Sequence, residues 1–425
     1  MRTTCAIAGG GPAGAVLALL LARAGVEVTL LEKHADFLRD FRGDTVHPST
    51  LQILDELGLA GEFLALPHRK AEKVLVWTDE RVLTVASLRG LKSRFPYIAF
   101  VPQWDFLNLV TAAARRYPTF RLLMEAEVVG LIREGDAVRG LRYRDRDGRE
   151  HELRAALTIG ADGRRSAVRR AAGLVPVEHG APMDVLWFRL PREDGDTADA
   201  FLRVSAGRMM VAINRESYWQ LAYLIPKGRF EQVRAEGIEA LRASIGTLVP
   251  FLAGRTGELA SMEQVSVLRV AVNRLRRWHR PGLLLLGDAA HAMSPVFGVG
   301  INLAVQDAVA AANLLAGPLR AGAVPEELLR RVQRRRTLPT VVTQLAQRAV
   351  QALVIRPALR DAPRPAPALR DRATPGGAAR PDAAPSRPRD PARLPLIGAL
   401  ARRFVGFGVL PEHVRTPQAP RAGAS

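Results

Sequence analysis

A glycine-rich turn near the N-terminus constrains this chain more than any other feature. The motif Gly9-x-Gly11-x-x-Gly14 stands between an apolar run at residues 3–8 and a segment of helical length at residues 12–24. In a strand–turn–helix unit, glycines so spaced permit a tight turn, bring the backbone close to a pyrophosphate and let the helix pack on the strand. The helix N-terminus then offers N–H groups and a positive dipole end to phosphate oxygens. We therefore expect a βαβ unit that binds a dinucleotide.

An acidic residue closes the second strand expected for this unit. Residues 26–32 are rich in β-branched side chains and end in Glu32, which Lys33 follows. A carboxylate at this place accepts a hydrogen bond from a ribose hydroxyl, whereas an arginine accommodates a 2′-phosphate. Glu32 therefore favours FAD or NAD over NADP as the bound dinucleotide.

Two further turns follow apolar strands. Residues 157–161 lead into Asp162-Gly163, and a run of four leucines at 283–286 leads into Gly287-Asp288. A carboxylate at the end of a buried strand can accept hydrogen bonds from sugar or ribityl hydroxyls. Each turn on its own could equally be a structural turn without a ligand. The two turns indicate a cofactor site only through their order along the chain together with the glycine-rich motif.

A loop and a helix follow the second of these turns. Pro295, Gly298 and Gly300 shape the loop, and Asn302 lies at the start of an apolar helix expected over residues 300–316. N–H groups at the start of this helix would face a flavin carbonyl that gains negative charge on reduction.

The order of the three motifs resembles that of a known family. A Gly-x-Gly-x-x-Gly turn near the N-terminus, an Asp-Gly in mid-chain and a later Gly-Asp are the triple signature of FAD-dependent monooxygenases. Residues 1 to about 350 resemble the aromatic-hydroxylase group, the class A flavoproteins typified by p-hydroxybenzoate hydroxylase. The resemblance implies that the motifs hold FAD.

The same resemblance assigns a role to each part of the cofactor site. The glycine-rich turn would hold the pyrophosphate and Glu32 the adenosine ribose. Asp162 would serve both FAD and the nicotinamide cofactor, and Asp288 would contact the ribityl and pyrophosphate region. Gln103 departs from the family, because many relatives carry an arginine there and an amide supplies a hydrogen bond without charge. The expected cofactor-binding residues are Gly9, Gly11, Pro12, Ala13, Gly14, Glu32, Lys33, Arg42, Gln103, Asp162, Gly163, Asp288, Pro295, Gly298, Gly300, Ile301 and Asn302.

The order of apolar runs and turns predicts an α/β fold with an inserted sheet. We expect a Rossmann-like FAD-binding domain built from discontinuous segments, an inserted mixed β-sheet substrate domain and a helical C-terminal tail. The expected boundaries are 1–70, 99–174 and 271–350 for the FAD-binding domain, 71–98 and 175–270 for the substrate domain, and 351–425 for the tail.

Composition changes within the tail. Residues 357–393 hold Pro, Ala, Arg, Gly and Asp with almost no bulky apolar side chains. Such a segment buries too little apolar surface to offset the entropy of ordering it. We therefore expect a disordered insertion there and a return to a helical pattern at residues 394–410.

The resemblance also implies an activity. NADH or NADPH would reduce the flavin, O2 would form a flavin C4a-hydroperoxide, and one oxygen atom would pass to an aromatic or polyketide-like small molecule. The same motifs serve related FAD-dependent reductases and dehydrogenases that insert no oxygen, so that alternative stays open. A flavin halogenase is less expected, because the chain lacks a Trp-x-Trp-x-Ile-Pro segment.

No residue is singled out by its pattern as the catalytic group. His47 lies near Arg42 in a loop expected close to the flavin, so it is a candidate acid/base group or hydrogen-bond donor, with a packed or solvated histidine as the alternative. His291 is expected to organise the turn after Asp288. Three residues of the second strand-rich block either line the substrate pocket or belong to the core, namely Tyr218, Trp219 and Gln220.

The net charge of +19 suggests a nucleic-acid partner, but the pattern of basic residues argues against one. Arginine supplies 56 of the 61 basic residues and is scattered rather than interleaved with aromatic residues. No zinc-finger, RNA-binding or basic-zipper pattern is present, so we expect no nucleic-acid partner. A non-enzymatic basic binding protein remains a third hypothesis, which a purified protein unable to take up FAD would favour.

Cellular context and metal content are inferred from a few residues. The single cysteine, Cys5, cannot form an internal disulfide and fits a reducing cytoplasm. The N-terminus has no signal-peptide pattern, and the apolar run at residues 13–22 is shorter than the roughly 18 residues of a bilayer span. We therefore expect a cytoplasmic protein without a transmembrane segment.

The eight histidines show no metal-ligand spacing, so we expect no metal site.

Overall fold

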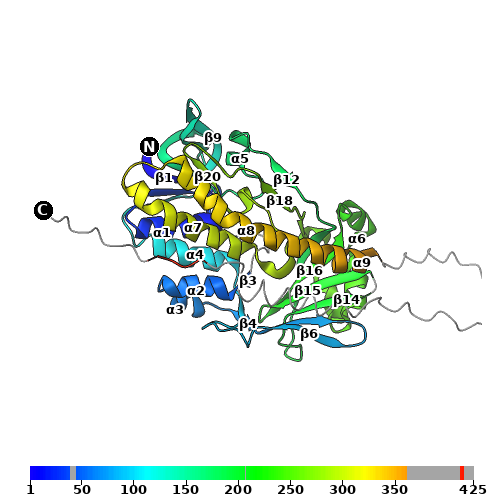
Figure 1. The fold of residues 1–425 in the computed structure, drawn as a ribbon. Helices are drawn as coiled ribbons and strands as arrows, with labels where there is room; N and C mark the ends of the chain where they lie inside the picture. Colours follow the sequence, from blue (N-terminus) through cyan, green and yellow to red (C-terminus); the bar gives the residue numbers. More distant parts are fainter. Residues whose placement is uncertain (39–44, 206, 361–411, 416–425) are drawn as a thin grey trace, which may run out of the picture.

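Two large sheets and the helices around them account for most of the fold in this computed structural model (Figure 1). The structure describes residues 1–38, 45–205, 207–360 and 412–415. Arg42, residues 361–393 of the expected disordered insertion and the helical pattern expected at 394–410 lie outside the described residues.

Parallel strands form the centre of the first sheet. Its order is β19–β20–β11–β1–β2–β8, and from β20 to β8 each strand runs parallel to its neighbours. An antiparallel hairpin of β9 and β10 extends from β11. The strands of this sheet are β1 (Arg2–Ala8), β2 (Val28–Leu31), β8 (Phe120–Leu123), β9 (Glu127–Glu134), β10 (Ala137–Arg144), β11 (Glu150–Gly160), β19 (His279–Arg280) and β20 (Leu283–Leu285). The carboxyl ends of the parallel strands therefore meet at one edge of the sheet.

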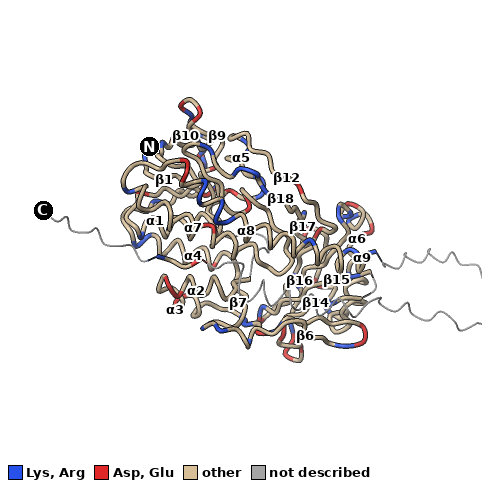
Figure 2. Tube along the Cα trace, viewed as in Figure 1, with Lys and Arg blue, Asp and Glu red and all other residues tan. Residues whose placement is uncertain are grey.

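A layer of long helices covers the first sheet. α1 (Pro12–Arg23) packs against α4 (Gln103–Ala114) and α7 (Gly300–Arg320), and α8 (Glu326–Val350) packs on α7. All residues from 13 to 22 are buried, because α1 lies between the sheet and these helices. The chain of α1 and α7 is largely uncharged, and charged residues gather on the loops and outer segments (Figure 2). α2 (Pro48–Glu56) and α3 (Ala60–Leu64) complete the layer.

One segment of this layer has the length and apolar composition of a membrane span. It covers Val296–Arg320 and so includes α7. However, 78% of its most apolar 18-residue stretch is buried inside the protein. Packing against α1, α2 and α8 accounts for its apolar character, as in a core helix.

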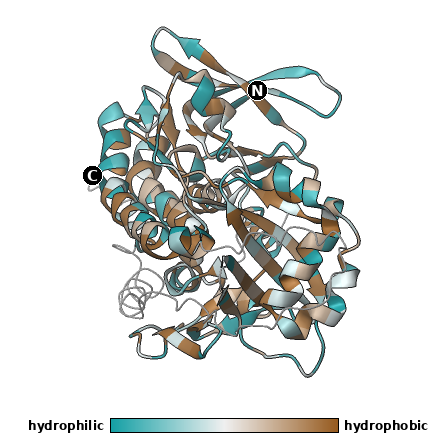
Figure 3. Ribbon diagram, turned by 90° about the vertical axis from the view of Figure 1, so that its right-hand side faces the viewer, coloured by the Kyte–Doolittle hydropathy of each residue, from teal (hydrophilic) through white to brown (hydrophobic). Residues whose placement is uncertain are grey.

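A mixed sheet forms the second large layer. Its order is β17–β13–β16–β15–β14–β5–β6, with β14 parallel to β5 and the other pairs antiparallel. Its strands, which carry mostly hydrophobic residues (Figure 3), are β5 (Lys73–Trp77), β6 (Val82–Ser87), β13 (Met183–Pro191), β14 (Phe201–Ser205), β15 (Arg208–Asn214), β16 (Tyr218–Pro226) and β17 (Ser266–Leu268). One face packs against α6 (Phe230–Leu248) and the 3-10 helix η1 (Pro250–Glu258). The other face meets α9 (Arg356–Arg360), which follows η5 (Gln351–Ile355) at the end of α8.

Two short sheets and a few helical turns join the large layers. β3 (Thr45–Val46) and β4 (Arg69–Ala71) both pair with β7 (Ile98–Phe100), and β12 (Pro176–Glu178) pairs with β18 (Asn273–Leu275). The helical turns are α5 (Ala167–Ala171), η2 (Met262–Gln264), η3 (Gly287–Ala289) and η4 (Val296–Gly298).

Two elements begin or divide differently from their predicted form. The stripe of Leu51, Leu54 and Leu57 predicts a helix over residues 45–57, but the helix begins only at Pro48. Residues 45 and 46 pair with β7 instead, and the residue before a proline is disfavoured in helical conformation. The composition of residues 122–132 predicts one strand, but this stretch is divided between β8 and β9 near Glu125, whose φ of 53° lies in the left-handed region.

Two further boundaries were wrong. Residues 357–360 were expected in the disordered insertion, but they belong to α9, where Leu359 is buried against the second sheet. Leu359 follows Ile355 by four residues, so the two side chains share one buried helical face. The composition of residues 264–272 predicts a strand over the whole stretch, but the strand is shorter, since only Ser266–Leu268 pairs with β13.

Candidate functional site

The predicted motifs come together at one edge of the first sheet. Gly9 follows β1, Glu32 follows β2, Asp162 lies beyond β11 and Asp288 lies beyond β20. These strands are parallel neighbours in the order β20, β11, β1 and β2, so their carboxyl ends lie side by side. Open α/β sheets bind ligands in the crevice outside such carboxyl ends.

The glycine-rich turn contains two packing positions and one open position. Gly9 has a φ of 100°, and a Cβ atom there would lie 2.5 Å from the carbonyl oxygen of Ala161. A Cβ atom on Gly14 would lie 2.0 Å from the carbonyl oxygen of Gly9, so α1 approaches β1 this closely only with glycine there. A Cβ atom on Gly11 would meet no atom of the described chain within 4 Å. Gly11 is also the N-cap of α1, so the first turn of this helix faces open space suited to a phosphate.

Glu32 fixes the turn from the neighbouring strand. Its Oε2 accepts a hydrogen bond from the Gly10 N–H at 3.0 Å, and its Oε1 accepts one from the His34 N–H at 3.1 Å. The Glu32 side chain is buried, whereas Lys33 is exposed. The expected contacts of both residues with the cofactor stay predictions.

The Asp162 carboxylate is used inside the protein. Its Oδ2 accepts a hydrogen bond from the Val168 N–H at 3.0 Å and its Oδ1 accepts one from Ser166 Oγ, so Asp162 holds the start of α5. Burial raises the pKa of Asp162 despite these hydrogen bonds. Gly163 has a φ of 79°, and a Cβ atom there would meet no atom of the described chain within 4 Å. The backbone at Gly163, rather than the Asp162 side chain, is therefore open to a ligand.

Arg164 joins the second and third motifs. Its Nε donates to Asp288 Oδ2 at 3.0 Å, which forms an ion pair across the carboxyl ends of β11 and β20. Its Nη1 is buried without a hydrogen-bond partner among the described residues. A buried guanidinium N–H is costly to leave unpaired, and the oxygens of an anionic ligand would satisfy it. Arg164 was not among the predicted site residues, although its place directly after the Asp-Gly motif was an available signal.

Asn302 presents a buried donor at the start of α7. Its Oδ1 accepts hydrogen bonds from the His47 N–H at 3.1 Å and from Thr50 Oγ1 at 2.6 Å. Because a backbone N–H can only donate, the first contact identifies the oxygen end of the Asn302 amide. The Nδ2 group is buried and has no hydrogen-bond partner in the described part of the chain, so it suits a carbonyl of a bound ring system. His47 is buried at the N-cap of α2, and its role in proton transfer stays a prediction.

The loop that precedes α7 is held from two sides. Thr45 Oγ1 donates to the Gly298 carbonyl at 2.7 Å, and a Cβ atom on Gly298 would lie 2.5 Å from that hydroxyl. From α8, Gln347 Nε2 donates to the carbonyls of Ser294 and Val296, each at 2.9 Å. The same loop carries the remaining predicted residues, with Pro295 before η4 and Gly300 and Ile301 in the first turn of α7.

Other predicted residues lie in different surroundings. Gln103 begins α4 and is half-buried, and its contact with the cofactor stays a prediction. Trp219 is fully buried in the cluster that includes α6, so it belongs to the core of the second sheet. Tyr218 and Gln220 alternate onto the opposite face of β16, where Gln220 Oε1 accepts a hydrogen bond from Arg215 Nε at 3.0 Å.

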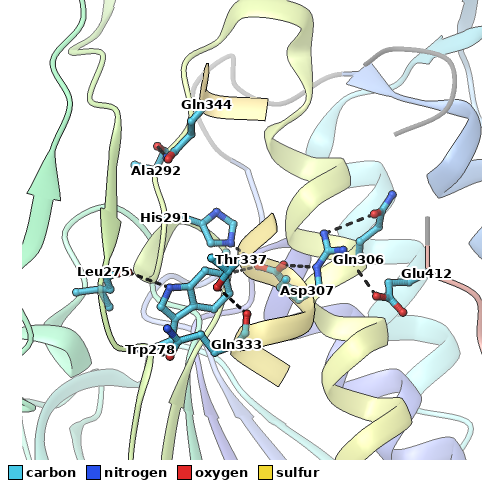
Figure 4. A network of polar contacts seen from close by, with 12 residues as sticks. Leu275, Trp278, His291, Ala292, Gln306, Asp307, Gln333, Thr337, Gln344 and Glu412 are labelled. Atoms are coloured by element: carbon cyan, nitrogen blue, oxygen red, sulfur yellow. Dashed lines mark hydrogen bonds and ion pairs between the residues drawn. The ribbon is translucent and has the colours of Figure 1, made fainter. Parts of the chain in front are cut away.

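A buried polar network surrounds Asp307 of α7 (Figure 4) and reaches the Gly287-Asp288 turn. Asp307 Oδ2 accepts a hydrogen bond from the Gly287 N–H at 3.1 Å and lies 2.6 Å from His291 Nε2. On the other side, Arg336 Nε donates to Asp307 Oδ1 at 2.9 Å. Burial alone would raise the pKa of Asp307, but His291 and Arg336 together hold it below its usual range. Asp307 and Arg336 were not predicted, and the signal for Asp307 was a lone charged residue in the apolar run 300–316.

The residues at this edge fit FAD. Open space adjoins Gly11 at a helix N-terminus, and two buried donors, on Arg164 and Asn302, lack partners among the described residues. Both donors suit a cofactor that carries phosphates and ring carbonyls. Within the described residues, no group of three or more His, Cys, Asp or Glu side chains could hold a metal ion.

Comparisons with known proteins agree with this geometry. The model of the family described as FAD binding domain matches residues 2–348. The chain is 34% identical over 339 residues to 6-methylpretetramide 4-monooxygenase of Streptomyces rimosus, a match that covers 79% of this chain and 80% of that protein. OxyS anhydrotetracycline hydroxylase from Streptomyces rimosus matches with a TM-score of 0.68 at 25% identity, over 85% of this chain and 70% of that chain. PqsL, a probable FAD-dependent monooxygenase from Pseudomonas aeruginosa, shares the fold with a TM-score of 0.72 at 23% identity, over 85% of this chain and 99% of that chain.

These matches confirm the expected α/β fold class and the resemblance to FAD-dependent monooxygenases. They also show that the protein is an FAD-dependent oxidoreductase. Since the match spans residues 2–348, which include every motif at the sheet edge, this chain belongs to the FAD binding domain family.

Proposed function

We propose that this chain is an FAD-dependent monooxygenase that uses NADH or NADPH and O2 to hydroxylate an aromatic or polyketide-like small molecule. The observation that carries the proposal is the 34% identity to 6-methylpretetramide 4-monooxygenase over most of both chains. The arrangement of the motifs at one sheet edge supports it, because the groups that a flavin hydroxylase requires for its cofactor are side by side.

In this proposal, FAD supplies the redox and oxygen chemistry when it is bound. Gly11 and the first turn of α1 bind the pyrophosphate, and Arg164 Nη1 offsets its negative charge. Asn302 Nδ2 and the first turn of α7 orient a ring carbonyl and favour the charge that develops there on reduction. The contacts expected from Lys33, Arg42 and Gln103 remain part of the proposal.

The substrate would lie between the loop that precedes α7 and the second sheet. Phe297 of this loop packs with Ile98 and Phe100 of β7 and with Ile213 of β15, so apolar side chains line the junction. Aromatic and branched apolar side chains suit a flat polycyclic molecule, because such a surface buries large ring areas.

Purified protein reconstituted with FAD tests the proposed function. We expect 6-methylpretetramide or anhydrotetracycline, used as probes, to stimulate NADH or NADPH oxidation. The product should carry one oxygen atom derived from isotopically labelled O2. Probe conversion without label in the product would establish the alternative, a reductase or dehydrogenase that inserts no oxygen. A protein that takes up no FAD would contradict both.

A further inference from the structure

Residues Glu412–Arg415, which we call the C-terminal clasp, join helices of the first layer. The Val414 N–H donates to Glu56 Oε2 of α2 at 2.8 Å. Asn313 of α7 accepts a hydrogen bond from the Arg415 N–H at 3.1 Å through its Oδ1. The clasp therefore ties α2 to α7, and both helices begin beside the cofactor edge.

Glu412 anchors the clasp in the interior of the protein. Its side chain is 3% exposed, and its Oε1 accepts a hydrogen bond from Arg335 Nε of α8 at 2.6 Å. The same oxygen lies 3.7 Å from Arg336 Nη1, and Arg336 is completely buried. Among the described residues, Glu412 and Asp307 are the two carboxylates in ion pairs with Arg336 (Figure 4).

The chain of contacts that begins at Glu412 ends at the Gly287-Asp288 turn. Asp307 holds Arg336 with one carboxylate oxygen and the Gly287 N–H with the other. Gly287 has a left-handed φ of 57°, and a Cβ atom there would lie 3.2 Å from the Cβ of Ala13 in α1. The turn therefore has little room to shift, and a displaced Asp307 carboxylate would lose either Gly287 or Arg336.

We propose that Glu412 is a positioning residue for the FAD site. Its charge balances the buried Arg336, Arg336 holds Asp307, and Asp307 fixes the Gly287-Asp288 turn in its cofactor-binding conformation. Removing one partner of a buried ion leaves an uncompensated charge, which the surrounding network must move to accommodate. Coupling between two sites is reciprocal, so bound FAD also stabilises the clasp. The inference concerns FAD alone and stands whether or not oxygen is inserted into a substrate.

The substitution Glu412→Gln tests this inference, because it keeps the size of the side chain and removes its charge. We expect the Kd for FAD to rise about tenfold, measured by flavin fluorescence during titration of the apoprotein well below its unfolding temperature. Glu56→Gln is the matched control, since Glu56 also bonds to the clasp but, among the described residues, its bonds go to His413 and Val414 rather than to Arg336 or Asp307. The control should change the Kd by less than about twofold. A wild-type Kd in Glu412→Gln, or equal changes in both variants, would overturn the proposal.

A second measurement uses the wild-type protein and so does not depend on how a variant folds. Amide hydrogen exchange is compared in the apoprotein and in the FAD-loaded protein. We expect FAD to slow exchange at the Val414 and Arg415 amides, which donate to α2 and α7. Protection confined to the Gly287 turn and the first turn of α1, with unchanged exchange at the clasp, would contradict the coupling.

Discussion

Packing against the described chain does not require a glycine at position 11, so we propose that a bound ligand does. An added Cβ atom would meet nothing in the described chain at Gly11, whereas the same atom would strike backbone at Gly9 and Gly14. Within this one motif, Gly9 and Gly14 allow the turn to pack against backbone, whereas Gly11 is proposed to make room for the pyrophosphate. Substitutions at such positions separate folding from cofactor affinity.

The substitution Gly11→Ala should leave folding intact and weaken FAD binding. The new methyl group enters the space expected for the pyrophosphate without touching the described chain, so we expect an unchanged apoprotein Tm and a Kd for FAD at least about tenfold higher. Calorimetry and flavin titration measure the two quantities. Gly61→Ala, at another open position on α3, should change neither the affinity nor the fold. Wild-type FAD affinity in Gly11→Ala would refute the placement of the pyrophosphate.

Phe297 holds strained backbone in the loop beside the cofactor edge. Its φ is 68°, a conformation that costs a residue with a side chain about 1 kcal/mol, and the Thr45 and Gln347 contacts hold the loop in place. Phe297→Gly relieves the strain but removes the ring that packs against the second sheet. The ring belongs to the apolar junction where the substrate is proposed to lie, so its loss should hold the substrate less well. With a probe that is hydroxylated, we therefore expect a severalfold larger share of NAD(P)H oxidation to yield hydrogen peroxide instead of hydroxylated product. Glu125→Gly, which relieves similar strain between β8 and β9, should leave this share unchanged.

At the scale of elements, long apolar runs could be predicted and short paired strands could not. β1, β11, β20, α1 and α7 have local patterns that a buried element requires, so their positions follow from sequence. β3 exists because β7 lies beside it, and the division of β8 from β9 depends on pairing with different strands. Such partners are set by tertiary structure and leave little trace in local sequence.

The candidate site likewise contains some residues that local sequence indicates and others whose position depends on tertiary partners. The glycine-rich turn and Asp288 belong to local motifs, so sequence alone proposes them, and their contacts with the cofactor stay predictions. The composition of residues 325–350 predicts a helix with a strongly basic face. Arg336 of this helix is nevertheless buried, because Asp307 and Glu412 approach it from distant parts of the chain. A charge is buried only where its partners are assembled, and one sequence window cannot show that assembly.

The contact between β19 and α8 should respond to pH. His279 is buried on β19, with Nδ1 2.9 Å from Glu326 Oε1. Burial, with a smaller contribution from Arg277, holds the pKa of His279 below its ordinary value of 6.5. The unfolded chain therefore binds this proton more tightly, so the His279 contribution to stability is lost as pH falls below about 6.5. We expect the urea midpoint to fall between about pH 7.5 and pH 5.5. The fall should be smaller in His279→Gln, and an equal fall would contradict the assignment.

At the scale of the whole molecule, the proposed cofactor site combines segments that are distant in sequence. Gly11, Arg164 and Asn302 each contribute to the site from a different part of the chain. A ligand that binds only their assembled arrangement stabilises the complete fold, because the unfolded chain offers no such site.

Removal of FAD should therefore lower the unfolding temperature of the protein. Free FAD at about one hundred times its Kd should add about 2.7 kcal/mol to the free energy of unfolding, which raises the Tm measured by calorimetry. Riboflavin at the same concentration is the control, because it lacks the pyrophosphate that Gly11 and α1 are proposed to bind. A Tm that FAD does not change, or that riboflavin raises equally, would contradict the proposed mode of binding.

The parallel pairing of β20 with β11 also sets an order of events during synthesis. Thr158, Ile159 and Gly160 of β11 pair with Leu283, Leu284 and Leu285, and the strands β13 to β17 of the second sheet are translated in between. At 5–20 residues per second, the ribosome needs roughly 6 to 24 s for the intervening stretch of about 120 residues. During that interval the nascent chain holds the glycine-rich turn but lacks Asp288 and Asn302. We therefore expect FAD to bind its complete proposed site only after the strands of the second sheet have been synthesised.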